Sequence, residues 1–260
     1  MIKSNHYLIV GGSTGMGFSA AEALVNAGAK VMIIGRNQDT VEAAQRALGE
    51  SCMGHVGDAC QAETIEAAIE IMHHHWGRID GLYHVAGGSG RRFGDGPLHE
   101  MTHEGWNKTF ELNLTSIMLS NRAIIRYFLK HGIAGKILNM GSVLGFSPSP
   151  AYFTTHAYAA TKSAIIGFSK SIAAHYAKDG IQVNVIAPAL VETPMAQRAK
   201  EDDQIQAFIK TKQPLDGGRM GIDKDLNDAV KMFLSTDNNF MTGQVLAVDG
   251  GWCLSEGQYA

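Results

Sequence analysis

A glycine-rich turn near the start of the chain constrains the fold most strongly. The segment Gly11-Gly-Ser-Thr-Gly15-Met-Gly17 follows an apolar, strand-like run at Tyr7–Val10 and opens a helix-like run at Phe18–Val25. In this context the first backbone N–H groups of the helix face the turn and bind a dinucleotide pyrophosphate. We therefore expect a dinucleotide to contact Gly11, Ser13, Thr14, Gly15, Met16 and Gly17.

Short apolar runs alternate with helical patterns along the rest of the chain. Seven runs are typical of buried parallel strands: Tyr7–Val10, Val31–Ile34, Gly54–Val56, Gly81–Val85, Lys136–Met140, Ile181–Ala187 and Gln244–Val248. Helical patterns such as Phe18–Asn26 and Glu63–His75 lie between them. Repeated strand-helix-strand units predict an α/β fold with a doubly wound, seven-stranded parallel sheet of the Rossmann type. Ligands of such sheets bind beyond the carboxyl ends of the strands.

The length and composition fit one dinucleotide-binding catalytic domain, residues 1–260. A chain of 260 residues that is 45% hydrophobic and 18% charged is ordinary globular material for one α/β core. The stretch 193–220 lacks clear periodicity and contains Gly217-Gly218, so we expect an excursion that covers the substrate. Its apolar side chains either cover the substrate or only pack, and they are Met195, Ile205, Phe208 and Ile209.

Net charge and cysteine content limit the expected partners and compartment. A formal net charge of −3 gives no reason to expect nucleic acid or an anionic membrane. No stretch approaches the roughly 18 apolar residues of a membrane span. We expect no secretory leader, since the first strand-like run follows almost at once without a charged n-region and a long apolar h-region. The odd set Cys52, Cys60 and Cys253 has no metal-ligand spacing and favours reduced thiols. We expect a cytoplasmic protein without a metal site.

A tyrosine and a lysine form a second pattern with chemical meaning. Tyr158 and Lys162 are four residues apart in a helical stretch, so their side chains share one face. A phenol with a pKa of roughly 10 is a poor base at neutral pH, and we expect nearby positive charge, from Lys162 and the oxidised nicotinamide, to lower that pKa. The pair predicts a proton donor and acceptor. Combined with a nicotinamide that carries hydride, it predicts an oxidoreductase acting on a carbonyl or an alcohol.

Further motifs stand in the same order as those of a known family. They are Asn113, Ser142, the Tyr158–Lys162 pair, Asn184-Val-Ile-Ala-Pro188-Ala-Leu-Val191-Glu-Thr193, Arg219-Met-Gly221 and Asp249-Gly-Gly251. With the Gly-x3-Gly-x-Gly turn, they make the chain from Leu8 to Trp252 resemble a short-chain dehydrogenase/reductase. The nearest pattern is that of the 3-oxoacyl-thioester reductases and secondary-alcohol dehydrogenases.

The resemblance implies four catalytic residues. Tyr158 would exchange the proton, and Lys162 would also hold the nicotinamide ribose. Ser142 would hydrogen-bond the substrate carbonyl oxygen, and Asn113 would hold a water that links Lys162 to solvent. The resemblance also implies a homotetramer.

The same resemblance places cofactor contacts at three further strand ends. Asp58 would bind the adenine amino group, or alternatively cap the helix that starts near Ala62. Ala86 and Gly87 would allow close approach of the cofactor. The nicotinamide end would meet Pro188, Val191 and Thr193.

Two segments depart from the family pattern. Tyr83-His84-Val85-Ala86-Gly87 stands where the family has Val-Asn-Asn-Ala-Gly, so the hydrogen bonds of both asparagines must be replaced. The interval from Ser142 to Tyr158 is about three residues longer than usual, which enlarges the loop beside the substrate. In that loop Tyr152 has no lysine four residues later, so we expect it to line the pocket or pack the loop.

The end of the second strand predicts which dinucleotide binds. Gly35 stands where an acidic residue would bind the adenosine ribose diol and repel a 2′-phosphate. Arg36, the next residue, can pair with that phosphate. Many NADP-using relatives have a second basic residue in the glycine turn, where this chain has Thr14. The pattern favours NADP, with NAD as the alternative.

The substrate is predicted only as a small-molecule ketone, 3-oxoacyl thioester or matching alcohol. Arg91 and Arg92 lie in a glycine-rich loop near the expected pocket mouth, where they either attract an anionic group or remain solvated or contact a neighbouring subunit. An enoyl reductase is a weaker alternative, because Tyr158 and Lys162 do not have its Tyr-x6-Lys spacing. A dinucleotide-sensing regulator is another, although such proteins tend to lose the catalytic pair.

Overall fold

One parallel sheet organises the protein, whose computed structural model describes residues 2, 4–193 and 196–259. Its strands are β1 (His6–Val10), β2 (Lys30–Gly35), β3 (Cys52–Val56), β4 (Gly81–His84), β5 (Lys136–Met140), β6 (Gln182–Pro188) and β7 (Val245–Val248). The spatial order is β3-β2-β1-β4-β5-β6-β7, and every pairing between neighbours is parallel. Each predicted strand overlaps an observed one, so the doubly wound seven-stranded sheet is confirmed.

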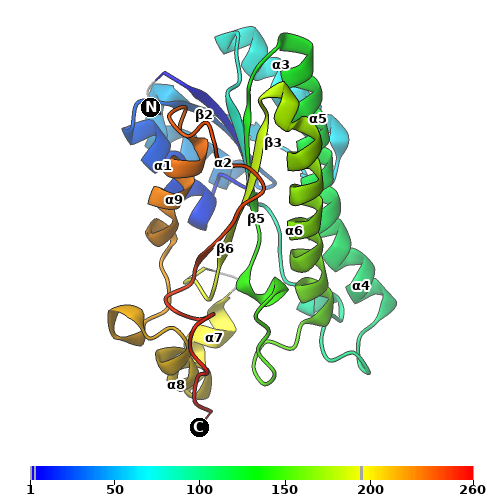
Figure 1. Ribbon diagram of the computed structural model, residues 1–260, viewed down its shortest axis with the longest axis vertical. Coiled ribbons are helices and arrows are strands. Elements are labelled where there is room, and N and C mark those ends of the chain that lie inside the picture. The colour runs from blue at the N-terminus through cyan, green and yellow to red at the C-terminus, as the bar shows by residue number, and fades with distance from the viewer. Residues whose placement is uncertain (1, 3, 194–195, 260) are drawn as a thin grey trace.

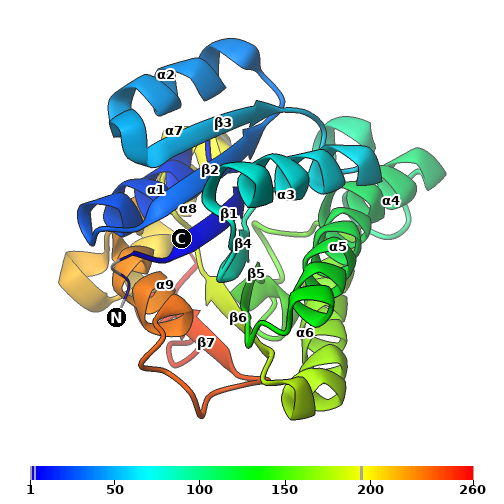
Figure 2. The same ribbon diagram turned by 90° about the horizontal axis from the view of Figure 1, so that it is seen from above.

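Helices cover both faces of this sheet (Figures 1 and 2). The helices of the described ranges are α1 (Gly15–Asn26), α2 (Gln38–Leu48), α3 (Ala62–Trp76), α4 (His103–Phe110), α5 (Ser116–His131), α6 (His156–Tyr176), α7 (Gln197–Glu201), α8 (Asp203–Lys212) and α9 (Asn227–Leu234). One layer contains α1, α2 and α9, and the other contains α3, α5 and α6 (Figure 2). The chain therefore forms a three-layer α/β sandwich.

Strand β1 shows why the strands read as continuous apolar runs. Leu8 and Val10 are fully buried in the core shared with α3 and α5. Tyr7 and Ile9 are equally buried, but in the core shared with α1 and α9. A strand covered by helices on both faces needs apolar residues at every position, so alternation is absent from its sequence.

The strand order changes direction between β1 and β4, and this point locates the ligand crevice. The chain runs from β1 outward to β2 and β3, then crosses to the other side of β1 to form β4. The two strand ends therefore send their loops in opposite directions, which opens a crevice at their carboxyl ends. The glycine turn after β1 and the Val85-Ala86-Gly87 segment after β4 meet there, since the N–H groups of Val85 and Ala86 donate to the Val10 carbonyl.

The expected excursion at 193–220 contains α7, α8 and a tight turn at Leu215–Gly218, beyond one end of the sheet (Figure 1). Residues 194 and 195, including Met195, lie outside the described residues. Ile205, Phe208 and Ile209 are fully buried in a small separate core with Trp252. Of the two alternatives for these three residues, packing is the observed one. Among the helices of the described ranges, none combines the length and apolar character needed to cross a membrane.

Candidate active site

Two adjoining cavities lie at the carboxyl ends of the strands. The larger has a volume of about 460 Å³ and lies over the ends of β1, β2 and β3. The smaller, of about 230 Å³, lies over the ends of β5 and β6. Both are lined by Met16, Val85, Gly87 and Thr193, so they meet at the point where the strand order changes. Every cofactor residue predicted from the sequence lines one cavity or the other.

The larger cavity contains the glycine turn. Its lining includes Gly11, Ser13, Thr14, Gly15, Met16, Gly17, Arg36, Asp58, Ala86 and Gly87. Gly11 has φ of +89°, and a Cβ there would stand 2.7 Å from the backbone nitrogen of Ala86. A Cβ on Gly17 would overlap the carbonyl oxygen of Gly11. The turn is therefore a close-packed cradle at the N-terminus of α1, which fits a dinucleotide pyrophosphate.

The wall at the end of β2 contains no carboxylate among its lining residues. A Cβ on Gly35 would overlap the Ser13 hydroxyl and stand 2.8 Å from Val41 Cγ2, so a larger residue requires local movement. Arg36 is exposed at the cavity edge, and Thr40 Oγ1 lies 3.3 Å from Ser13 Oγ. This wall consists of one guanidinium and two hydroxyl groups.

Asp58 lies in the wall of the larger cavity and does not cap the following helix. Helix α3 begins at Ala62, and its N-cap residue is Gln61. The Asp58 carboxylate instead accepts a hydrogen bond from the backbone N–H of Cys60, at 2.9 Å. The alternative of a helix cap is therefore wrong, because the carboxylate closes a turn before the helix starts.

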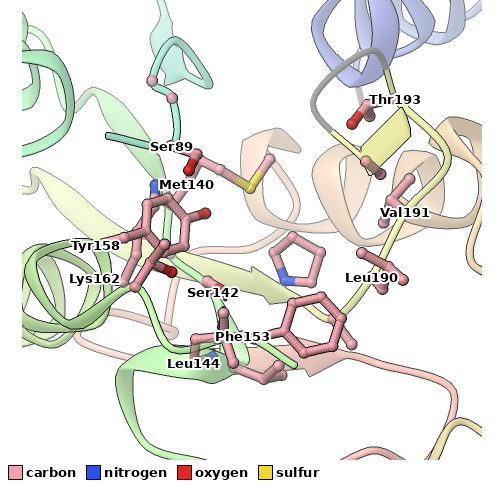
Figure 3. Close-up of a pocket in the computed structure, with 18 of the residues that line it drawn as sticks. Ser89, Met140, Ser142, Leu144, Phe153, Tyr158, Lys162, Leu190, Val191 and Thr193 are labelled. Atoms are coloured by element: carbon pink, nitrogen blue, oxygen red, sulfur yellow. Dashed lines mark hydrogen bonds between the residues drawn. The ribbon is translucent and has the colours of Figure 1, made fainter. Parts of the chain in front are cut away.

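Ser142, Tyr158 and Lys162 converge on the smaller cavity, on the side opposite Leu190, Val191 and Thr193 (Figure 3). Tyr158 and Lys162 share one face of α6, and the Lys162 Nζ lies 5.4 Å from the Tyr158 ring centroid. Lys162 Nζ also donates to the Met140 carbonyl at 2.9 Å, at the end of β5. The Met140 carbonyl and the α6 backbone together hold the Lys162 amine next to the Tyr158 ring.

Burial controls the protonation of this pair in the protein alone. It raises the pKa of Tyr158 to about 12, against the opposite effect of its hydrogen bond with Ser142. It lowers the pKa of Lys162 to about 7. Lys162 and the oxidised nicotinamide were together expected to lower the pKa of Tyr158; in the protein alone, desolvation dominates. Tyr158 is thus a neutral phenol, the form that donates a proton to a developing alkoxide.

Asn113 lies behind the smaller cavity and lines neither cavity. It is fully buried in a π-helical turn, Glu111–Thr115, between α4 and α5. Its Nδ2 donates to the carbonyls of Thr109 at 2.8 Å and Gly88 at 2.9 Å, and its Oδ1 accepts from the Gly88 N–H at 3.2 Å. The bond to Thr109 replaces part of the α-helical ladder, which accounts for the wider turn. A Cβ on Gly87 would stand 2.7 Å from Asn113 Oδ1 and 3.8 Å from Lys162 Nζ, so Gly87 lies between them.

His84, at one of the two positions where the family pattern has asparagine, makes its own hydrogen bonds at the end of β4. It is fully buried, with Nδ1 2.7 Å from Ser120 Oγ and Nε2 3.2 Å from the Ala86 carbonyl and 3.3 Å from Ser116 Oγ. A carbonyl only accepts, so we assign the proton to Nε2. Burial and the charge of Lys162 lower the pKa of His84 to about 3, and the ring stays neutral. The single histidine thus ties β4 to α5.

Asp95 is a functional residue that the sequence analysis missed. It is buried, and its two carboxylate oxygens accept the backbone N–H groups of Ala157 and Tyr158, each at 3.0 Å. These are the first unpaired donors of α6, so Asp95 caps the catalytic helix from a distant loop. The only sequence signal was an Asp-Gly pair in a glycine-rich loop, and nothing in it identified the helix that it caps.

The remaining wall of the smaller cavity comes from loops. Apolar side chains predominate, namely Val143, Leu144, Phe153, Leu190 and Trp252, and two guanidinium groups, Arg91 and Arg198, lie beside them. Tyr152 is absent from the lining of both cavities. Its ring packs at 5.2 Å from Phe208 and 5.8 Å from Tyr259, measured between centroids. Of the two expectations for Tyr152, loop packing is the observed one.

Comparison with known proteins places this geometry in one family. A family model described as "Enoyl-(Acyl carrier protein) reductase" matches residues 10–253. The 3-oxoacyl-[acyl-carrier-protein] reductase FabG of Escherichia coli is 35% identical over 244 residues, which are 94% of this chain and 95% of that protein. The 2-(S)-hydroxypropyl-CoM dehydrogenase 3 of Xanthobacter autotrophicus is 33% identical over 257 residues, or 96% of this chain and 97% of that protein.

A solved structure gives the same result. A short-chain type dehydrogenase/reductase from Mycobacterium ulcerans is 30% identical and superposes with a TM-score of 0.89, over 98% of this chain and 92% of that one. The matched range contains both cavities and the Tyr158–Lys162 pair. The chain therefore belongs to the short-chain dehydrogenase/reductase family, as an NAD(P)-dependent oxidoreductase that interconverts a carbonyl compound and an alcohol.

Proposed function

We propose that the enzyme uses NADP to reduce a ketone or 3-oxoacyl compound, or to oxidise the matching secondary alcohol, with Tyr158 as proton donor and acceptor. The observation that carries this proposal is the convergence of Ser142, Tyr158 and Lys162 on a cavity that joins the glycine-lined one. When bound, the nicotinamide supplies the hydride. The protein supplies the proton and the alignment of the carbonyl.

The proposed roles follow from the positions and charges of the side chains. Tyr158 and Ser142 hydrogen-bond the substrate oxygen, and the neutral Tyr158 hydroxyl gives it a proton during reduction. Lys162, with its pKa lowered to about 7, holds the ribose of the cofactor and exchanges a proton near neutral pH. Asn113 orders a water between Lys162 and solvent, a role supported by its position across Gly87 from the amine.

The composition of the β2 wall supports NADP over NAD. A 2′-phosphate there would meet the Arg36 guanidinium and the hydroxyls of Ser13 and Thr40, and the end of β2 carries no carboxylate that would repel it. Gly35 supports the same choice, since the Ser13 side chain fills the space that a Cβ needs.

Two other functions receive less support. The relatives named 3-oxoacyl reductase and dehydrogenase favour carbonyl chemistry, whereas the enoyl reductase spacing Tyr-x6-Lys is not formed by Tyr158 and Lys162. A sensing role needs no acid, and here the phenol and amine both lie at a cavity.

The proposed assembly is a cytoplasmic homotetramer. Large apolar side chains remain exposed on the single chain: Trp106 on α4, Leu129 on α5, Phe240 before β7 in the sequence and Leu254 after it. Burial of such residues between copies is a common basis of closed oligomers. The free cysteines Cys52, Cys60 and Cys253 support a reducing compartment. Light scattering on the purified protein tests the assembly.

The decisive experiment combines a substrate panel with one matched pair of variants. NADPH and NADH oxidation is measured against 3-oxoacyl thioesters, small ketones, diketones, keto sugars and keto steroids. Tyr158→Phe is expected to lower kcat by about 10²- to 10⁴-fold, the usual contribution of a general acid, with dinucleotide affinity retained. Tyr152→Phe, which alters a packed phenol, is expected to keep its activity. Normal turnover by Tyr158→Phe would exclude this residue as the acid.

A further inference from the structure

Two guanidinium groups from distant parts of the chain meet at the smaller cavity. Arg91 lies in a short 3₁₀ turn, Arg91–Phe93, after β4, and Arg198 lies on α7. Both line the cavity, and the Nη2 atoms of both donate to the carbonyl of Tyr152, at 3.4 Å and 2.8 Å respectively. The two cations therefore share one acceptor.

Neither guanidinium forms an ion pair with a carboxylate among the described residues. None of the ion pairs found in the described ranges includes Arg91 or Arg198. Asp95 attracts Arg91, but both of its oxygens already accept backbone N–H groups of α6. Partial desolvation is the largest cause that lowers the pKa of Arg91, and the charge of Arg198 lowers it further, because the two guanidiniums repel each other. An anion between them would remove this repulsion.

The neighbouring Arg92 provides a contrast. Its guanidinium stacks over the Phe93 ring at 4.7 Å from the centroid, and Arg92 does not line the cavity. The sequence had paired Arg91 with Arg92 because they are adjacent. The 3₁₀ turn separates them, and the fold pairs Arg91 with Arg198 instead.

The order of groups along the cavity defines a ligand shape. Ser142 and Lys162 are 6% and 2% exposed and lie at the buried end with Tyr158, whereas Arg91 and Arg198 are exposed. The apolar side chains of Leu144, Phe153 and Leu190 complete the lining. A ligand that satisfies all three parts has a carbonyl or hydroxyl group, an apolar segment and a negative charge.

We propose that Arg91 and Arg198 bind an anionic group of the substrate, so that the enzyme selects oxo or hydroxy compounds bearing a carboxylate, sulfonate or phosphate. This inference rests on the proposed function, because it uses the same cavity and the same reacting oxygen. Planar guanidiniums form paired hydrogen bonds with such groups, which gives orientation as well as affinity. The anion would hold the carbonyl of a flexible substrate against Ser142 and Tyr158.

The test compares matched ketones that differ only in charge. Short oxo acids, their methyl esters, and oxo alkyl sulfonates and phosphates are assayed with the wild-type enzyme and the variants Arg91→Gln, Arg198→Gln and Arg198→Lys. The ratio of kcat/KM for the acid to that for its ester is expected to exceed about 10 in the wild type and to fall about tenfold in each Gln variant, a typical charged-pair loss. Arg198→Lys retains charge without the planar fork, so its ratio should be intermediate. The anionic group that gives the highest kcat/KM among carboxylate, sulfonate and phosphate indicates the chemical class of the substrate.

Arg92→Gln is the matched control, since it removes an adjacent guanidinium outside the cavity, and its ratio should equal that of the wild type. Equal ratios in the wild type and the Gln variants would overturn the inference. A second result would also overturn it: activity only toward 3-oxoacyl groups on a carrier protein, with kcat/KM lowered as much in Arg92→Gln as in the Arg91→Gln and Arg198→Gln variants. The arginines would then bind the surface of the carrier protein.

A binding experiment separates this inference from the proposed function. Calorimetry measures the affinity of non-reacting alkyl carboxylates and sulfonates for wild-type, Tyr158→Phe and Arg198→Gln protein. Binding that persists in Tyr158→Phe and is lost in Arg198→Gln supports the anion site even if no ketone is reduced. Ketone turnover without anion binding leaves the proposed function intact and refutes the anion site.

Discussion

The two cavities are built in different ways. The larger cavity, which we propose binds the dinucleotide and call the dinucleotide side, consists of strand ends and the first turn of a helix. Glycines there bring backbone within contact distance: a Cβ on Gly11 would stand 2.7 Å from the Ala86 nitrogen. The smaller cavity, which we propose binds the substrate and call the substrate side, is assembled from loops after β4, β5 and β6 together with α6, α7 and the C-terminal region. Its contacts join residues far apart in sequence, such as Asp95 with the start of α6.

This difference shows which properties of a site are local. The dinucleotide side depends on backbone shape, which a short motif specifies. The substrate side depends on side chains that meet only after the sheet has formed. Changes on the first side should therefore act through steric fit, and changes on the second through lost tertiary contacts. The following predictions test that separation.

The largest effect is expected for Gly17→Ala. The new Cβ would overlap the Gly11 carbonyl oxygen, and backbone atoms in a close-packed turn cannot yield easily. We expect dinucleotide affinity to fall at least about 100-fold, or about 2.7 kcal/mol, in a fluorescence titration.

Gly167→Ala on α6 is the matched control, because a Cβ there meets no atom within 4 Å. It should leave dinucleotide affinity unchanged and raise the free energy of unfolding by up to about 1 kcal/mol, the helix preference for alanine. Normal dinucleotide binding by Gly17→Ala would show that the turn tolerates expansion, and the steric argument would then be wrong.

The next effect is expected for Asp95→Ala on the substrate side. The variant leaves the N–H groups of Ala157 and Tyr158 unpaired at the start of α6. We expect the free energy of unfolding to fall by about 2 kcal/mol, as for other buried donors that lose a partner. We also expect kcat to fall about tenfold through displacement of Tyr158, a smaller change than loss of the phenol itself.

Asp95→Asn keeps an acceptor oxygen, so the free energy of unfolding and kcat should both fall less than in Asp95→Ala. Dinucleotide affinity distinguishes positioning from general damage, since Asp95 is not among the residues that line the larger cavity. A fall in dinucleotide affinity as large as the fall in kcat would contradict the separation of the two sides.

A smaller effect, confined to one cofactor, is expected for Arg36→Gln. Loss of the guanidinium beside the β2 end should raise the KM for NADPH about tenfold, or about 1.4 kcal/mol, and leave the KM for NADH nearly unchanged. Steady-state kinetics with each cofactor measure the ratio. An equal change for both cofactors would remove the support for a 2′-phosphate contact.

The smallest effect concerns His84, at the boundary between the two sides. Its pKa is about 3 in the folded protein and 6.5 in the reference state, so the unfolded chain binds more protons between these values. The neutral His84 therefore contributes to the free energy of unfolding at pH values above its pKa in the unfolded chain, and this contribution is lost as the pH falls. The loss is about 1 kcal/mol between about pH 7 and about pH 5.5. Denaturant unfolding of wild type and His84→Asn measures it, and parallel pH dependences of the two proteins would refute the assignment.

The sequence predicted the sheet well because buried parallel strands have a local signature. Lys136–Met140 was predicted with its observed bounds, and the other strands differ only at their ends. The glycine turn and the Tyr158–Lys162 spacing are also local patterns. Burial is not a local pattern, so the desolvation that raises the Tyr158 pKa in the protein alone could not be predicted from the sequence.

Contacts between distant loops could not be predicted in the same way. Arg91 was paired with Arg92 because a sequence displays only short-range relations, whereas Arg198 reaches Arg91 through the Tyr152 carbonyl. The role of Asp95 was missed for the same reason. The histidine that replaces asparagine was visible, but its partners Ser116 and Ser120 on α5 were not.

The π-helical turn at Glu111–Thr115 also determines how this part of the chain can change in length. A π-turn holds one residue more than an α-helical turn, so deletion of one residue there would join α4 and α5 into a continuous helix. Each residue of an α-helix rotates its successor by about 100°, so the deletion would turn Asn113 away from Gly88 or displace α4. The helix would become regular, and the loop that carries Arg91 and Asp95 would lose its anchor. The hydrogen bonds between Asn113 and Gly88, in the loop after β4, therefore constrain how many residues the segment from α4 to α5 can contain.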